Sequence, residues 1–183
     1  DGLAWTDVRP ATRAAWERAA QRRVLDDDRP LDVIDNEDVV DLLNDLLESA
    51  RDGEYGFHAC AEHAESGQLK GIFQRHSREC AAAAVELEHE IRRLHGDPVQ
   101  GGTVAGALHR GWVSVKTALS TQDDKAVLEE CERGEDAAVA RYRKALKAAL
   151  PADVRALVER QAQGAQRNHD EVRALRDGFS PRP

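Results

Sequence analysis

Carboxylate side chains occur where the periodicity of apolar residues predicts the buried face of a long helix. In residues 121–149, Glu135 lies on such a face. The residues that share its spacing of three and four are Leu128, Cys131, Ala138, Tyr142, Ala145 and Ala149. Glu54 interrupts a similar stripe earlier in the chain, and Glu79 lies beside another. A buried charge is unfavourable unless a cation, a proton or hydrogen bonds compensate it, so these residues predict a cation site or a buried polar network.

A metal ion is the simplest partner for such a group of carboxylates. The candidate ligands are Glu54, Glu79, Glu132, Glu135 and His169. Carboxylates with a histidine suit iron, manganese or zinc, so iron or another divalent metal is the predicted cofactor. In the alternative, arginine or lysine side chains or carboxylic-acid hydrogen bonds compensate the charges, and the network fixes the register of the helices. No nucleophile with an adjacent base can be assembled, so enzymatic activity is left open.

Four long helices are required to hold these side chains. They are predicted at residues 36–66, 68–95, 121–149 and 151–177, with no convincing strand pattern. Asn36 is the expected N-cap of the first helix, and Gly96-Asp97-Pro98 stops the second. The turns within the first and second pairs are short, so each pair is antiparallel. A shorter helix at 103–119 is long enough to return along the bundle, which makes the second and third long helices parallel.

The rise of an α-helix places the polar residues at one level. With a rise of about 1.5 Å per residue, Glu54, Glu79 and Glu135 all lie roughly 25 Å from the end where the first helix starts. His169 lies at a similar height on the fourth helix, and His58 and His76 lie about one turn higher. The sequence therefore predicts one layer to which each helix contributes a polar side chain.

The rest of the chain sets limits on its class and location. The 183 residues divide into an N-terminal helical appendage with an acidic linker (1–35), the bundle (36–177) and a tail (178–183). A formal net charge of −8 argues against a nucleic-acid binder, and no apolar run is long enough to span a membrane. Three cysteines without metal-type spacing predict free thiols in a reducing, cytoplasmic compartment. The chain contains no methionine, which is consistent with a missing native N-terminus.

Several runs of the sequence resemble a bacterial domain family of unknown function. These runs are Asp52-Gly53-Glu54-Tyr55-Gly56-Phe57, Gly106-Ala107-Leu108-His109-Arg110-Gly111-Trp112, Glu130-Cys131-Glu132-Arg133-Gly134-Glu135-Asp136 and His169-Asp170. The family is classed with the ferritin-like four-helix bundles, and the resemblance covers about residues 37–177. It implies an all-α ferritin-like fold with a helical crossover between the second and third long helices, and it brings no established activity.

The ferritin-like superfamily binds metal through one Glu on each of two helices and a Glu-x-x-His motif on each of the other two. By resemblance, Glu54 matches one of the single carboxylates, and Glu132 or Glu135 matches the other. Both Glu-x-x-His motifs are incomplete at the expected level, because Ala82 replaces the histidine of one and Gln166 replaces the glutamate of the other. The resemblance therefore supports the fold more strongly than a two-iron oxidase.

These observations favour a non-enzymatic ferritin-like bundle with a buried carboxylate and histidine layer. Its expected role is stress-related or self-associating, with a second copy of the chain or another protein as partner and no nucleic acid or membrane. The alternative is a metal-binding protein, with iron as the first choice of metal and an oxidase or storage role.

Overall fold

The structure, a computed structural model, describes residues 34–100 and 124–179. The predicted N-terminal helix, the predicted crossover helix at 103–119 and most of the predicted tail lie outside these residues. Among the described helices, none is both long enough and apolar enough to cross a membrane.

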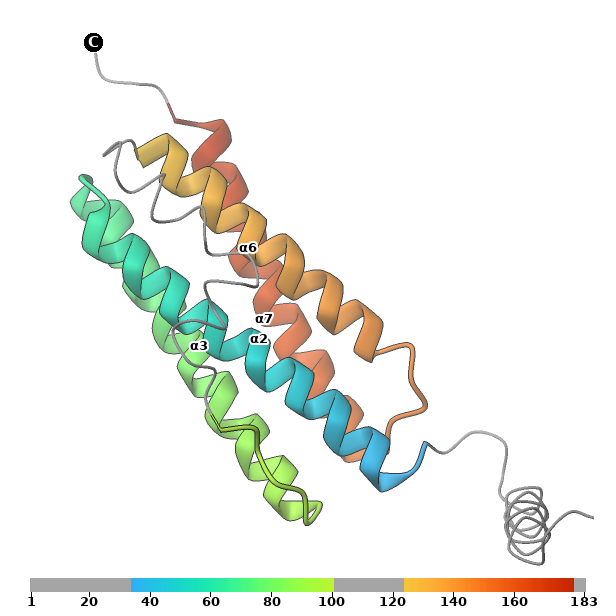
Figure 1. Cartoon of the computed structure of the whole chain (residues 1–183). Helices are drawn as coiled ribbons and strands as arrows, with labels where there is room; N and C mark the ends of the chain where they lie inside the picture. Colours follow the sequence, from blue (N-terminus) through green and yellow to red (C-terminus); the bar gives the residue numbers. More distant parts are fainter. Residues whose placement is uncertain (1–33, 101–123, 180–183) are drawn as a thin grey trace, which may run out of the picture. The chain divides into compact units, whose positions relative to one another are not determined.

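The described part of the chain forms an all-α four-helix bundle, as the sequence predicts (Figure 1). Its helices are α2 (Asn36–His63), α3 (Gly67–Arg93), α6 (Asp124–Ala145) and α7 (Ala152–Asp177). Helix α2 packs against α3 and α6, and α7 packs against α6 and α3, so the four helices surround a common interior. The predicted third helix is too long, because α6 ends four residues before Ala149.

Hydrogen bonds between distant residues establish the directions of α2, α3 and α6 relative to one another. The side-chain amide of Asn36 donates to the carbonyl oxygen of Leu94 at 2.8 Å, so the end of α3 lies beside the start of α2. The carboxylate of Asp124 accepts from the backbone N–H groups of Glu65 at 2.8 Å and Ser66 at 3.1 Å. The start of α6 therefore lies at the turn between α2 and α3, at the other end of the bundle. Helices α3 and α6 run parallel, as predicted.

The ends of the helices differ from the prediction in detail. Asp35 is the N-cap of α2, and its carboxylate accepts from the N–H of Asp38 at 2.9 Å. The prediction of Asn36 as the N-cap is wrong, because that side chain bonds to α3 instead. Helix α3 ends through His95, which has a φ of 60°, while the N–H of Gly96 donates to the carbonyl of Ile91 at 2.9 Å. This left-handed residue followed by a bond to the carbonyl five residues earlier ends the helix in a Schellman motif.

Gly96 is the position at this stop where a side chain has no room. A Cβ there would lie 2.5 Å and 2.7 Å from the two methyl carbons of Val40 and 3.2 Å from Cγ2 of Ile91. We expect Gly96→Ala to lower the free energy of unfolding by about 1–3 kcal/mol, because the added methyl group overpacks this contact. Urea denaturation followed by circular dichroism measures the change. Gly67→Ala is the control, since no atom lies within 4 Å of its added Cβ; equal losses in both variants would contradict the packing argument.

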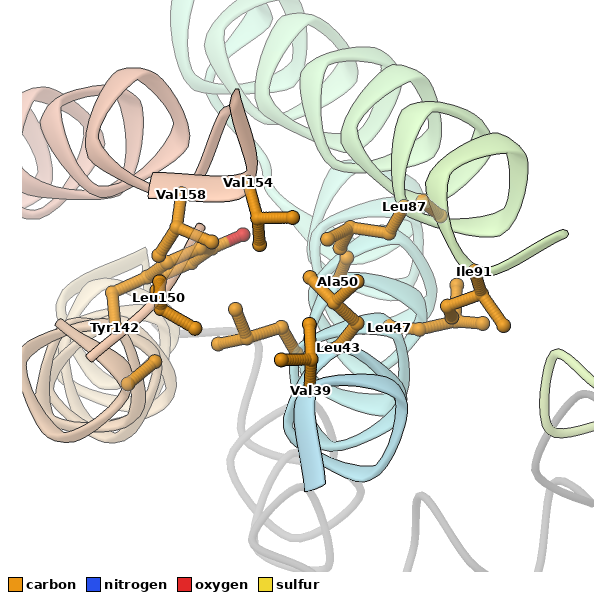
Figure 2. Packing of buried hydrophobic residues seen from close by; sticks show 13 residues of the cluster. Val39, Leu43, Leu47, Ala50, Leu87, Ile91, Tyr142, Leu150, Val154 and Val158 are labelled. Carbon is orange, nitrogen blue, oxygen red and sulfur yellow. The ribbon is translucent and has the colours of Figure 1, made fainter. Parts of the chain in front are cut away.

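Two apolar cores lie at different levels of the bundle. The one at the start of α2, here the Val39 core, contains the side chains drawn in Figure 2. Its labelled members are Val39, Leu43, Leu47, Ala50, Leu87, Ile91, Tyr142, Leu150, Val154 and Val158. The second, here the Phe57 core, lies towards the turn between α2 and α3. Its larger members are Phe57, Leu69, Ile72, Phe73, Val127, Leu128 and Val172.

A polar layer separates the two cores along every helix. On α2, α3, α6 and α7 respectively, the buried polar residues between the two apolar sets include Asp52, Ser77, Glu135 and Gln161. Each helix therefore places a buried polar side chain between the two cores, although not all at one level: Ser77 bonds to the carbonyl of Glu54, whereas Gln161 bonds to that of Ala83, six residues further along α3 than Ser77.

Candidate functional site

A cavity of about 430 Å³ opens at the polar layer, and residues from all four helices border it. Alanine and glycine form the apolar part of its border, and polar and charged side chains form the rest. The alanine and glycine residues are Ala50, Gly53, Ala82, Ala83, Gly134, Ala137, Ala138, Gly164 and Ala165. Small side chains at the same level of four packed helices leave space that larger ones would fill, so the alanine-rich composition of the chain is the direct cause of the cavity.

Glu135 is a deeply buried acidic group at the border of this cavity. It is only 3% exposed, and its Oε2 atom has no hydrogen-bond partner. Burial, and then the charge of Glu79, raise the pKa of Glu135 to about 8 from an ordinary value of 4.5. The carboxyl group is therefore largely protonated at neutral pH, and a cation that entered the cavity would meet an acceptor that has no partner in the described residues.

Several other charged groups that border the cavity have partners, and one more, Arg167 on α7, is exposed. Arg141 on α6 lies 4.0 Å from the carboxylate of Asp52 on α2, which is 6% exposed. Arg133 makes an ion pair of 2.5 Å with Glu130, the residue three positions before it. Because these two arginines are directed to other carboxylates, neither compensates the charge that Glu135 would carry when ionised.

A hydrogen-bonded chain forms another side of the cavity. The hydroxyl group of Tyr142 donates to Oε1 of Gln161 at 3.1 Å. The Nε2 group of Gln161 then donates to the carbonyl of Ala83 at 3.2 Å and to Glu86 at 2.9 Å. Arg160 also binds Glu86 at 2.9 Å, and these bonds lower the pKa of Glu86 despite its partial burial. This side of the cavity is therefore polar and satisfied, in contrast to Glu135.

The three cysteines lie at close contacts between helices. Cys60 and Cys131 are fully buried in the Phe57 core with their sulfur atoms 3.2 Å apart, and all three cysteines are free, as predicted. Cys80 borders the cavity, and a Cβ added to Gly53 would lie 2.9 Å from its sulfur. The glycine therefore lets α2 approach α3 at the polar layer. Burial raises the pKa of the Cys80 thiol strongly, so the thiol is a poor nucleophile.

The predicted metal ligands are divided among several places. Glu79 and Glu135 both border the cavity. The side chain of Glu79 is half exposed, and its Oε1 atom lies 3.9 Å from Nε of Arg75. Glu132 is buried and binds the guanidinium group of Arg176. Glu54 is exposed, so the prediction that it interrupts the buried stripe of its helix is wrong.

His169 is buried, as predicted, but its ring nitrogens already have carboxylate partners. Its Nε2 atom lies 3.1 Å from Asp136 on α6, and its Nδ1 atom lies 3.0 Å from Asp170. His58 is exposed, whereas His76 is fully buried and binds Glu171 through Nε2 at 3.0 Å. Neither His76 nor His169 borders the cavity.

Three of the predicted carboxylates nevertheless lie near one thiol, that of Cys80. After burial, the charges of Glu135, Glu79 and Glu54 in turn raise the pKa of Cys80, so all three lie around this thiol. The prediction for Glu54 is wrong in the direction in which its side chain points from α2, which is towards solvent. In the described ranges, no group of three or more His, Cys, Asp or Glu side chains could hold a metal ion, so the five predicted ligands do not fit one metal site as a set.

Sequence reasoning missed two residues of the layer. Asp52 is buried on α2 where Glu54 was expected, and Gln161 joins α7 to α3 and α6. The spacing of Ser49, Asp52 and Gly56, all of them buried, is the signal that could have revealed Asp52, because three small or polar residues at intervals of three and four indicate a second inward row.

Comparison with known proteins adds a family but no activity. The family described as Domain of unknown function (DUF2383) matches residues 38–148, which include α3, α6 and all of α2 except its first two residues. No curated protein matches the sequence.

Proposed function

The chain belongs to the DUF2383 family, whose function is unknown, and we propose that its bundle is a non-enzymatic binding protein that holds one small organic molecule in the cavity at the polar layer. The observation that carries this proposal is the unpartnered, buried carboxyl group of Glu135 beside a space of about 430 Å³. An empty apolar space alone would be a packing defect. A space that contains an unsatisfied polar group has a reason to be filled by a complementary molecule.

The dimensions and composition of the cavity support this proposal. Sites for small molecules commonly have volumes of about 300–1,000 Å³ and combine an apolar lining with a few polar groups. Here the alanine and glycine residues supply the apolar surface, and Glu135 supplies a hydrogen-bonding group without a partner. Helical bundles commonly place ligand sites between facing helices, as this bundle does.

A substitution that fills the cavity should abolish binding. We expect Ala138→Phe to weaken the binding of phenylbutanol, a neutral probe, by at least about tenfold, since the new ring occupies the space of the ligand. Isothermal titration calorimetry of the full chain measures the affinity. Ala140→Phe adds the same ring to an exposed position of α6 and should leave the affinity unchanged. Equal affinities for both variants, or no binding of the probe by the unaltered chain, would contradict the proposal.

A divalent metal is the second candidate ligand. It is favoured by the two predicted ligands that border the same cavity, Glu79 and Glu135, because the charge of one raises the pKa of the other. Elemental analysis after anaerobic loading with Fe²⁺ tests this candidate. Metal that is retained by the unaltered chain and lost from Glu135→Ala would support it.

The sequence-based expectations of a ferritin-like relationship and of self-association belong to the same proposal. The parallel course of α3 and α6 is consistent with the ferritin-like connection. In residues 34–100 and 124–179, the exposed large hydrophobic side chains are Tyr55 on α2 and Val85 on α3. Light scattering of the full chain measures its molar mass and so determines whether it forms an oligomer.

A further inference from the structure

We infer that the ligand of the cavity is an amphiphilic organic amine, whose ammonium group binds Glu135 and whose apolar body contacts the surrounding alanines and glycines. This inference rests on the proposed binding function and specifies the chemical class of its ligand. Its basis is the set of ion pairs around the cavity, which leaves Oε2 of Glu135 without a hydrogen-bond donor.

The first step concerns the sign of the ligand charge. Arg141 is directed to Asp52, and Arg133 is directed to Glu130. The third arginine at the border, Arg167, is exposed, and no arginine is among the groups that shift the pKa of Glu135. Glu135 has no such partner in the described chain, and the second carboxylate nearby, Glu79, increases the negative potential at it. A cationic group would stabilise the ionised form of Glu135, which is largely protonated when no ligand is bound, while an anionic group would be repelled by Glu79.

The second step concerns the kind of cation. A small divalent metal requires several ligand atoms at once, and no group of three metal-binding side chains occurs in the described residues. An ammonium group needs fewer: a single carboxylate can form a charge-assisted hydrogen bond with it, and its remaining donors can bind other oxygens or water. The donor set at Glu135 therefore fits an ammonium group better than a metal ion.

The third step concerns the remainder of the ligand. The surface next to Glu135 is supplied by Gly134 and Ala138 on the same helix, and Ala50 and Ala83 face the same cavity from α2 and α3. This part of the border is apolar. It favours an aliphatic or aromatic body attached to the amine, because that body leaves water when it binds.

Three probes with one carbon skeleton test this inference on the full chain. They are phenylbutylamine, phenylbutanol and phenylbutyrate, which carry an ammonium, a hydroxyl and a carboxylate group. By isothermal titration calorimetry, we expect the amine to bind at least about tenfold more tightly than the alcohol, and the carboxylate to bind most weakly. Glu135→Gln should remove the preference for the amine while the alcohol still binds. Glu129→Gln removes an exposed charge from the same helix and should preserve the preference.

The outcomes separate this inference from the binding function itself. If the alcohol or the carboxylate binds as tightly as the amine, or if Glu135→Gln retains the preference, the amine is the wrong class although the cavity binds ligands. If none of the probes binds, both proposals fail. If Mn²⁺ binds the unaltered chain, displaces the amine and fails to bind Glu135→Gln, a metal replaces the amine as the ligand and the inference is overturned.

Discussion

Glu135→Gln is expected to raise the free energy of unfolding by roughly 3–5 kcal/mol at pH 8.5 and to change it little near pH 4. The substitution preserves the size of the side chain and removes its ability to ionise. In the folded chain, burial and the charge of Glu79 raise the pKa of this carboxyl group to about 8, whereas its ordinary value is 4.5. The difference between these two values sets both the size and the direction of the effect.

The pH dependence follows from the protons that each state binds. Below the ordinary pKa of 4.5, Glu135 is protonated in both states and does not affect the balance between them. As the pH rises towards about 8, the unfolded chain releases this proton while the folded chain retains it, so stability decreases. Above that pH both states are ionised and the penalty stays constant. Glutamine has no such penalty, so its advantage grows through the same interval.

Urea denaturation at a series of pH values measures this effect. The difference between the unaltered chain and Glu135→Gln should increase steadily between pH 4.5 and about 8, where the folded carboxyl group titrates. Glu129→Gln serves as the control for the loss of one charge, because Glu129 is exposed on the same helix. Stability curves that run parallel for the unaltered chain and Glu135→Gln would show that the carboxyl group is solvated or compensated in the folded protein.

Phe57→Ala should lower the free energy of unfolding by about 3–5 kcal/mol, the second large effect. The ring is completely buried in the Phe57 core. It stacks on Phe73 with ring centroids 6.2 Å apart and meets the edge of His76 at 5.0 Å. Removing the ring eliminates these contacts and leaves a cavity between α2 and α3.

Thermal and urea unfolding of Phe57→Ala measure this loss. The neighbouring variant His58→Ala is a suitable control, since the side chain of His58 is 67% exposed and its removal should change the stability by no more than about 0.5 kcal/mol. A similar change for both variants would mean that the Phe57 core contributes little to the stability of the bundle.

The height of residues along the helices was predictable because the rise per residue is nearly constant. An error of two residues at a helix end moves a side chain by only about 3 Å along the axis. The same error turns it by about 200° around the axis, so the facing of a side chain is much less certain. Glu135 was placed correctly because Cys131 and Tyr142 define the buried face on both sides of it. Glu54 is exposed although Ala50 and Phe57, four residues before it and three after it, are both buried, so periodicity alone does not determine which way a side chain at this position points.

The partners of the charged groups could not be predicted from the sequence. Glu132 binds Arg176, and His169 binds Asp136, although each pair belongs to two different helices. These pairs depend on how α6 and α7 are rotated against each other, and helical periodicity describes each helix alone. The cavity was not predicted for a related reason: an alanine-rich surface can close by tight packing, and only the helix positions determine whether space remains.

The two hydrogen bonds that Asp124 accepts connect the start of α6 to the turn between α2 and α3. The N–H groups of Glu65 and Ser66 precede α3, where no helical carbonyl is available to them. If the α2–α3 pair or the α6–α7 pair forms alone, these two N–H groups stay unprotected from exchange with deuterium. Their exchange rates therefore report whether the two pairs are docked, independently of whether the helices themselves are formed.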